Sequence, residues 1–168
     1  MSTTPKCTVY LDYAATTPMD PRVLEAMLPY FTSEYGNPSS LYAQGRRAKE
    51  GMDKARMTIG RILGCSADEL IFTGSGTESD NMAVLGVPRN YASRGKHVIT
   101  SAIEHHAVLT AAEHLQKEGF EVTFLPVDVY GMVSPDAVVA AIRPDTTLIS
   151  IMLANNEIKA LVIALGIG

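Results

Sequence analysis

Residues 97–126 read HVITSAIEHHAVLTAAEHLQKEGFEVTFLP, and the hydrophobic pattern of this segment changes twice. Residues 97–101 form a short, mostly apolar run that favours a β-strand, and apolar residues at helical spacing follow over 106–118. Gly119 is a typical helix end, and a second strand-like run occupies 120–126. Because parallel strands need a long crossover connection, the segment predicts two parallel strands joined by a helix.

The same alternation extends in both directions from this segment. Toward the amino terminus we expect a strand at 69–73 and a helix from 78 to about 93. Toward the carboxyl terminus a helix begins at 134–136, and a near-continuous apolar strand runs over 146–153. Four parallel strands with helical crossovers predict an α/β fold, a doubly wound sheet with three α/β/α layers.

Two further helices are expected before the sheet. Asp20 and Pro21 form a typical helix start, as N-cap and first helical residue. A loop follows at 35–40 by composition, and a longer helix runs from about residue 41 to a stop at Gly64.

Composition limits the classes of protein that fit. The chain has 168 residues, of which 46% are hydrophobic and 19% charged, which suits one globular domain. The net charge is −4 and the basic residues are scattered, so nucleic acid is not an expected partner. Residues 1–8 are polar, and the apolar run at 160–168 is far shorter than the roughly 20 residues that span a membrane. We therefore expect a cytoplasmic protein with no membrane partner, in which Cys7 and Cys65 are incidental thiols.

Three polar clusters follow predicted strands, at 73–79, 103–106 and 154–157. The carboxyl ends of parallel strands share one edge of a sheet, and ligands of doubly wound folds bind at that edge. The sequence therefore predicts that the three clusters contribute to one site.

The first cluster, TGSGTES at 73–79, has the composition of a phosphate-binding turn. Glycines between a strand and a helix let backbone N–H groups approach a phosphate at the positive end of the helix, and Thr77 could add a hydroxyl. The segment nearly matches the dinucleotide pattern GxGxxG, but Ser79 replaces the last glycine and Ser101 stands where an acidic residue is expected. A plain tight turn is the alternative.

The other two clusters leave their roles open. His105 and His106 stand side by side after a strand, where one of them is expected to face the ligand edge, although a single histidine is often a surface or core residue. Asn155 and Asn156 are equally compatible with a turn and with amide contacts to a ligand oxygen.

Five segments occur in a distinctive order: VYLDYAATTP at 9–18, GNPSS at 36–40, FTGSGTESDN at 72–81, EHHAV at 104–108 and NNEI at 155–158. Together they resemble the signatures of cysteine desulfurases, in the class V aminotransferase group of enzymes. The similarity covers residues 9–158 and implies the fold of the large domain of transferases that depend on pyridoxal 5'-phosphate (PLP).

The resemblance implies PLP as the cofactor, no metal, and four residues that contact PLP. Gly76 and Thr77 match the turn that holds the phosphate. His105, rather than His106, matches the catalytic histidine that stacks on the pyridine ring and assists proton transfer. Asn156 matches the amide that contacts the phenolic oxygen.

The resemblance also implies a reaction and partners. Proteins of this kind take sulfur from L-cysteine, release L-alanine and pass a persulfide to a sulfur acceptor or an iron–sulfur scaffold protein. They act as homodimers, and segments 12–17 and 36–40 would line the substrate side near the dimer partner.

The covalent chemistry of the family needs a Lys for the Schiff base, an Asp facing the pyridine nitrogen and a mobile nucleophilic Cys. In the homologues these residues lie beyond the similar region, so we expect an amino-terminal portion that is inactive by itself. The expected parts are an N-terminal arm (1–20), a partial PLP-binding α/β domain (21–158) and a divergent apolar tail (159–168). A non-catalytic PLP- or phosphate-binding remnant and a small nucleotide-binding α/β domain remain alternatives.

Overall fold

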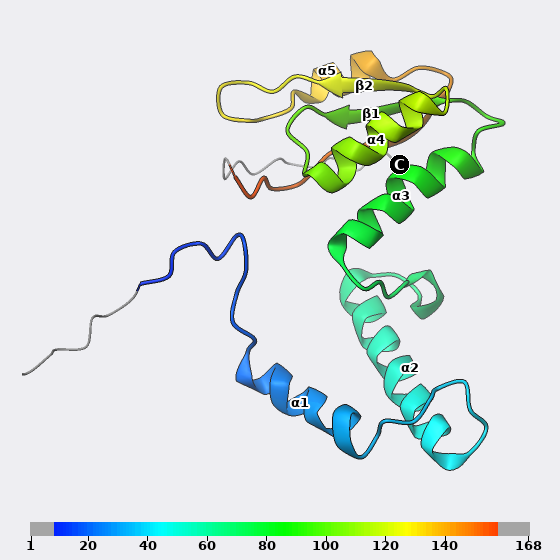
Figure 1. The fold of residues 1–168 in the computed structure, drawn as a ribbon. Coiled ribbons are helices and arrows are strands. Elements are labelled where there is room, and N and C mark those ends of the chain that lie inside the picture. Colours follow the sequence, from blue (N-terminus) through cyan, green and yellow to red (C-terminus); the bar gives the residue numbers. More distant parts are fainter. Residues whose placement is uncertain (1–8, 158–168) are drawn as a thin grey trace, which may run out of the picture. The chain divides into compact units, whose positions relative to one another are not determined.

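The structure, a computed structural model, describes residues 9–157. The chain divides into two compact units, Met1–Phe72 and Thr73–Gly168, and each is described here by itself (Figure 1). The expected apolar tail at 159–168 and Cys7 lie outside the described residues. Among the described residues, no helix combines the length and apolarity that crossing a bilayer requires.

The first unit contains two α-helices whose ends follow the expected signals. Helix α1, Pro21–Thr32, begins after Asp20, whose carboxylate accepts a 2.8 Å hydrogen bond from the backbone N–H of Arg22. Helix α2, Ala43–Leu63, ends at Gly64, which adopts the left-handed conformation with φ +73°. A side chain is strained in that conformation, so glycine is the natural residue at this helix end.

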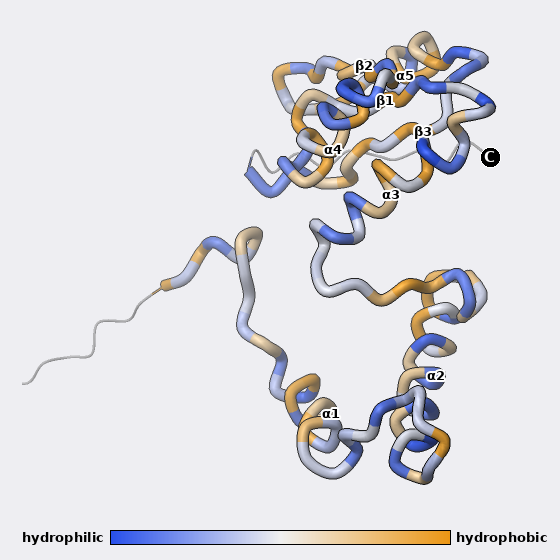
Figure 2. The backbone as a smooth tube through the Cα atoms, turned by 45° about the vertical axis from the view of Figure 1, so that its right-hand side comes forward, coloured by the Kyte–Doolittle hydropathy of each residue, from blue (hydrophilic) through white to orange (hydrophobic). Residues whose placement is uncertain are grey.

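The strand expected at 69–73 is not formed, and this prediction was wrong. A short 3₁₀ helix, η1 at Ala67–Glu69, occupies its start, and residues 70–73 lie outside any ladder. The segment between α2 and α3 includes a short hydrophobic stretch (orange in Figure 2), yet Ile71 is 66% exposed and Phe72 48% exposed. A strand requires hydrogen-bonding partners along its backbone, and no strand among residues 9–157 pairs with this segment.

The second unit is built on the other three predicted strands. Strands β1 (His97–Ser101), β2 (Glu121–Leu125) and β3 (Thr146–Ser150) form a parallel sheet in the order β2-β1-β3. All five residues of the central strand β1 are buried, as expected for a strand paired on both sides and covered on both faces.

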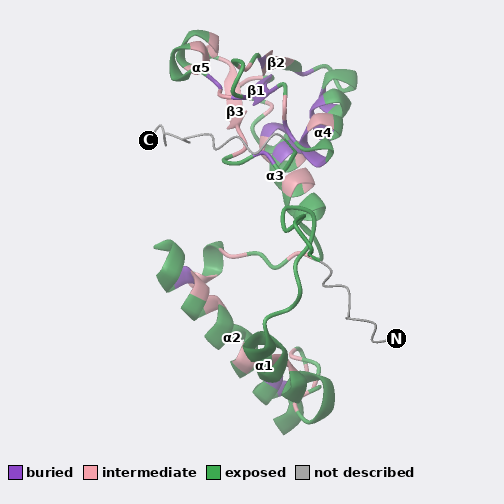
Figure 3. Cartoon of the chain, turned by 90° about the vertical axis from the view of Figure 1, so that its left-hand side faces the viewer, coloured by how far each residue is buried: buried purple, intermediate pink, exposed green. Residues whose placement is uncertain are grey.

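Helices cover both faces of the sheet, so the predicted three-layer α/β/α arrangement is confirmed. Helices α3 (Gly76–Asn90) and α4 (His106–Lys117) pack on one face through a core that includes Val84, Val98 and Leu115. The short helix α5 (Pro135–Ala141) packs on the other face, against a core that includes Ile99 and Leu125. The buried residues concentrate in β1 and α4 (Figure 3). Each fully buried aliphatic side chain of this kind contributes about 1.5–3 kcal/mol to folding.

Candidate functional site

The turn before α3 is held closed by side chains of its own sequence. Ser75 is the N-cap, and its Oγ accepts a 3.2 Å hydrogen bond from the backbone N–H of Glu78. The Glu78 carboxylate in turn accepts a 2.6 Å hydrogen bond from the N–H of Gly74. The hydroxyls of Thr73 and Ser79 lie 2.6 Å apart across the same turn. These contacts fix the direction in which the first amides of α3 point.

Two of those amides are available to a ligand. The backbone N–H groups of Gly76 and Thr77 have no hydrogen-bond partner within residues 9–157. A Cβ placed on Gly76 would meet no atom within 4 Å, so the space beside this residue is open. Free amides at the positive end of a helix suit the phosphate of PLP, and the Thr77 side chain is exposed beside them.

His105 begins the next helix on the same face of the sheet. It is the N-cap of α4, and its Nδ1 accepts a 3.1 Å hydrogen bond from the N–H of Ala107. In the neutral ring the proton therefore sits on Nε2. The neighbouring ring of His106 lies edge-on, with the ring centroids 6.4 Å apart and the planes at 65°.

Glu104 is a member of the site region to which the sequence analysis gave no role. The residue is only 7% exposed, and its carboxylate Oε1 accepts hydrogen bonds from Ser101 Oγ (2.8 Å) and from the Met152 backbone N–H (2.7 Å). Burial raises the pKa of the Glu104 carboxyl above its ordinary value, the two hydrogen bonds oppose that rise, and the charge of Asp80 on α3 adds to it. An acidic residue three positions after the serine that ends a buried strand was the available sequence signal.

The two asparagines after β3 have different environments. Asn155 is 9% exposed; its Nδ2 donates to the carbonyl oxygen of Ile103 at 2.7 Å, and its Oδ1 accepts from the N–H of Glu157 at 2.8 Å. Asn156 is exposed. The structure thus gives Asn155 a structural contact and leaves Asn156 facing solvent.

The residues predicted to contact PLP stand at the starts of α3 and α4 and after the end of β3. Helices α3 and α4 begin on the side toward which β1 and β2 point (Figure 1). The hydrogen bond from Asn155 to Ile103 joins the segment after β3 to the segment after β1. A common pocket for Gly76, Thr77, His105 and Asn156 stays a prediction.

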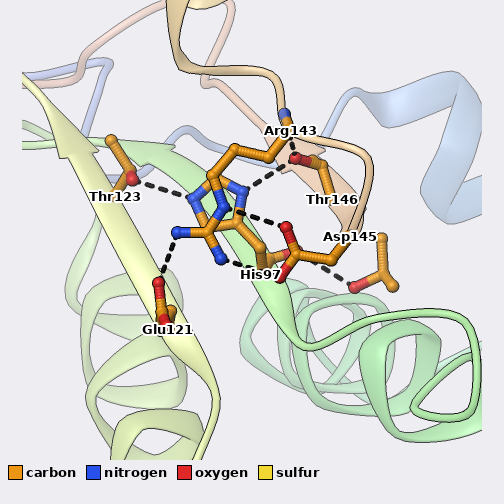
Figure 4. Close-up of polar contacts among 7 residues, drawn as sticks. His97, Glu121, Thr123, Arg143, Asp145 and Thr146 are labelled. Carbon is orange, nitrogen blue, oxygen red and sulfur yellow. Dashed lines mark hydrogen bonds and ion pairs between the residues drawn. The ribbon is translucent and has the colours of Figure 1, made fainter.

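A separate polar cluster lies at the opposite edge, where the strands begin (Figure 4). The ring of His97 is fully buried there and is hydrogen-bonded to Thr123 and Thr146. Arg143 forms ion pairs with Asp145 and Glu121 beside that ring. Every polar group of this cluster is paired with another side chain, which indicates a structural role.

The two segments expected to line the substrate side belong to the first unit. In the 12–17 segment, the carbonyl oxygens of Asp12 and Thr16 accept hydrogen bonds from the Tyr10 hydroxyl, at 2.9 and 3.2 Å. Residues Pro38, Ser39 and Ser40 of the 36–40 segment line a hollow of about 530 Å³ beside α2.

No group of His, Cys, Asp and Glu side chains among the described residues is arranged to hold a metal ion. The predicted contacts are backbone amides, a histidine and an amide side chain, which are groups that can bind an organic phosphate.

Comparison with known proteins identifies the family. The family model described as Aminotransferase class-V matches residues 9–160. The chain is 55% identical over 150 residues to "Cysteine desulfurase IscS" of Methanosarcina thermophila, covering 89% of this chain and 37% of that protein. It is 47% identical to "Putative cysteine desulfurase IscS 1" of Bacillus subtilis, covering 89% of this chain and 40% of the relative.

Solved structures give the same result. A "NIFS-like protein" superimposes with a TM-score of 0.88 at 40% identity, over 92% of this chain and 42% of the other. The structure titled "SspA in complex with cysteine" superimposes with a TM-score of 0.84 at 39% identity, over 89% and 43%. The chain spans about two fifths of the length of the proteins it matches, and over that span it belongs to the aminotransferase class-V family.

Proposed function

We propose that this chain forms the phosphate-binding and ring-contacting part of a PLP-dependent cysteine desulfurase. The observation that carries the proposal is the pair of unpartnered amides of Gly76 and Thr77 at the start of α3. In this proposal they act with His105 at the start of α4 and with Asn156 after β3. Similarity to proteins named cysteine desulfurase supports the choice of chemistry.

Each residue has a distinct task in this proposal. The amides of Gly76 and Thr77, with the Thr77 hydroxyl, hold the phosphate. His105 stacks on the ring and carries an exchangeable proton on Nε2, because its Nδ1 is occupied by the Ala107 amide. Asn156 binds the phenolic oxygen through its side-chain amide. When bound, PLP supplies the electron sink that makes bonds of an amino acid labile.

The substrate in this proposal is L-cysteine, whose sulfur passes to an acceptor or iron–sulfur scaffold protein, in a cytoplasmic homodimer. The relative titled "SspA in complex with cysteine" supports the substrate class. No lysine of this sequence stands in the Ser-Gly-His-Lys context that the resemblance associates with covalent attachment of PLP. We therefore propose reversible PLP binding and no L-alanine release by the 168-residue chain alone.

Equilibrium dialysis of the 168-residue chain against PLP tests the proposal. We expect PLP to bind more tightly than pyridoxal, which lacks the phosphate, and inorganic phosphate to compete with PLP. Thr77→Val removes one hydroxyl and is expected to weaken PLP binding about tenfold, because hydrogen bonds to charged groups contribute about 1.5–3 kcal/mol.

The matched control is Thr110→Val, which removes an exposed hydroxyl from α4 rather than from the start of α3. Equal losses in the two variants, or equal affinities for PLP and pyridoxal, would contradict the proposal. Tighter binding of a nucleotide than of PLP would favour the nucleotide-binding alternative.

A further inference from the structure

Glu104 connects the ends of two strands beyond the point where the sheet stops. Its Oε1 accepts from Ser101, the last residue of β1, and from the backbone N–H of Met152, two residues after β3. A single carboxylate oxygen therefore continues the connection between β1 and β3 after their backbone ladder has ended.

A second hydrogen bond joins the same two segments. The Asn155 side chain donates to the carbonyl oxygen of Ile103 at 2.7 Å. Each linking residue directly precedes a residue of the proposed site: Glu104 precedes His105, and Asn155 precedes Asn156. The two links thus flank the backbone that carries the proposed ring contacts.

Stability alone does not explain a carboxylate at position 104. Burying a charged group is unfavourable, and Asp80 on α3 adds repulsion. A glutamine would offer an oxygen to the same two donors without that cost. A carboxylate makes shorter and stronger hydrogen bonds than a neutral amide, so its benefit is a more rigid connection between the two segments.

We propose that Glu104 is a positioning residue, which sets the separation of His105 and Asn156 by joining the segments that carry them. This inference rests on the proposed PLP site. Glu104 does not itself need to contact the cofactor, and its effect is confined to the ring contacts, because the phosphate amides lie on α3.

The test compares Glu104→Ala and Glu104→Gln with the control Glu113→Ala, which removes an exposed carboxylate from α4. Amide hydrogen exchange followed by NMR reports the link itself. We expect the Met152 amide to lose protection about tenfold or more in the alanine variant, to keep most of it in the glutamine variant, and to be unchanged in the control.

Dialysis against PLP and against inorganic phosphate reports the positioning role. Glu104→Ala is expected to weaken PLP binding about tenfold while leaving phosphate binding unchanged, and Glu104→Gln to restore most of the PLP affinity. If the alanine variant does not fold, Ser101→Ala takes its place, since it removes one of the two hydrogen bonds and leaves the carboxylate bound to Met152.

Each other outcome has a distinct meaning. Wild-type affinity for PLP in a variant whose Met152 amide has lost protection would overturn the positioning role alone. Equal losses of PLP and phosphate affinity would show a general structural effect and would overturn it as well. A wild-type chain that binds no PLP would refute the proposed function and this role with it, while the Met152 exchange would still show whether the link exists.

Discussion

His97 Nδ1 lies 2.7 Å from Thr146 Oγ1, so a buried imidazole on the central strand is hydrogen-bonded to the first residue of β3. The other ring nitrogen lies 2.8 Å from Thr123 Oγ1 on β2. One ring thus connects all three strands at the edge opposite the candidate site (Figure 4). A neutral imidazole donates at one nitrogen and accepts at the other, which matches two hydroxyl partners.

Acid is expected to destabilise the second unit through His97. Burial lowers the pKa of His97 below its ordinary value of 6.5, the nearby Arg143 lowers it further, and Asp145 and Glu121 oppose the change. As the pH falls through 6.5, the unfolded chain binds a proton that the folded chain does not, so stability decreases until the folded-state pKa is reached. The contribution of one such group is at most about 1.4 kcal/mol per pH unit.

Urea unfolding at pH 7.5 and at pH 5.0 measures this effect. His97→Gln is expected to be less stable at neutral pH and to lose this part of the pH dependence. His114→Gln changes a histidine with a 56% exposed side chain on α4 and should keep the wild-type difference between the two pH values. Identical pH dependence in wild type and His97→Gln would show that His97 does not carry the acid sensitivity.

Neighbouring asparagines are expected to give opposite results. Asn155→Ala removes the hydrogen bond to Ile103 and leaves a partly buried carbonyl oxygen without that donor, so it should lower the free energy of unfolding by about 1–3 kcal/mol. Asn156→Ala changes an exposed side chain and should weaken PLP binding with little effect on unfolding. Urea denaturation and PLP dialysis of both variants measure the contrast. If Asn155→Ala proved the more stable of the two, the structural assignment of Asn155 would be wrong.

The charge of Glu78 is expected to oppose phosphate binding. Its carboxylate accepts from the Gly74 amide within the turn that precedes the proposed phosphate amides. Glu78→Gln keeps an oxygen for that hydrogen bond and removes the negative charge. PLP affinity should therefore rise about two- to fivefold at low salt, the range expected for a charge at a helix end. The gain should shrink at high salt, because ions screen exposed charges. An unchanged affinity at low salt would place the phosphate away from this turn.

Local signals predicted much of the fold because they act over a few residues. The N-cap at Asp20, the left-handed glycine at Gly64 and the strand-helix-strand pattern of 97–126 all have the expected structure. The strand expected at 69–73 failed because a strand depends on a distant partner, and an apolar run of that length does not specify one.

The site shows the same division between local and distant information. The turn at 73–79 could be recognised because its hydrogen bonds join residues close in sequence. The role of Glu104 could not, because its Met152 partner is 48 positions away, and the separation of Asn155 from Ile103 is 52. The cofactor roles of Gly76, Thr77, His105 and Asn156 remain predictions until ligand binding is measured.

Two glycine-to-alanine substitutions should change stability in opposite directions. A Cβ on Gly95 would lie 2.2 Å from the carbonyl oxygen of Asp145, which belongs to the backbone just before β3. Because neither backbone can move without disturbing the sheet, Gly95→Ala should lower the free energy of unfolding by about 1–3 kcal/mol. Gly86 lies within α3, where an added Cβ meets no atom within 4 Å. Gly86→Ala should therefore raise stability by about 0.5–1 kcal/mol, since alanine loses less conformational freedom in a helix. Urea midpoints of the two variants against wild type measure both effects, and a stable Gly95→Ala protein would mean that the chain before β1 does not approach Asp145 this closely.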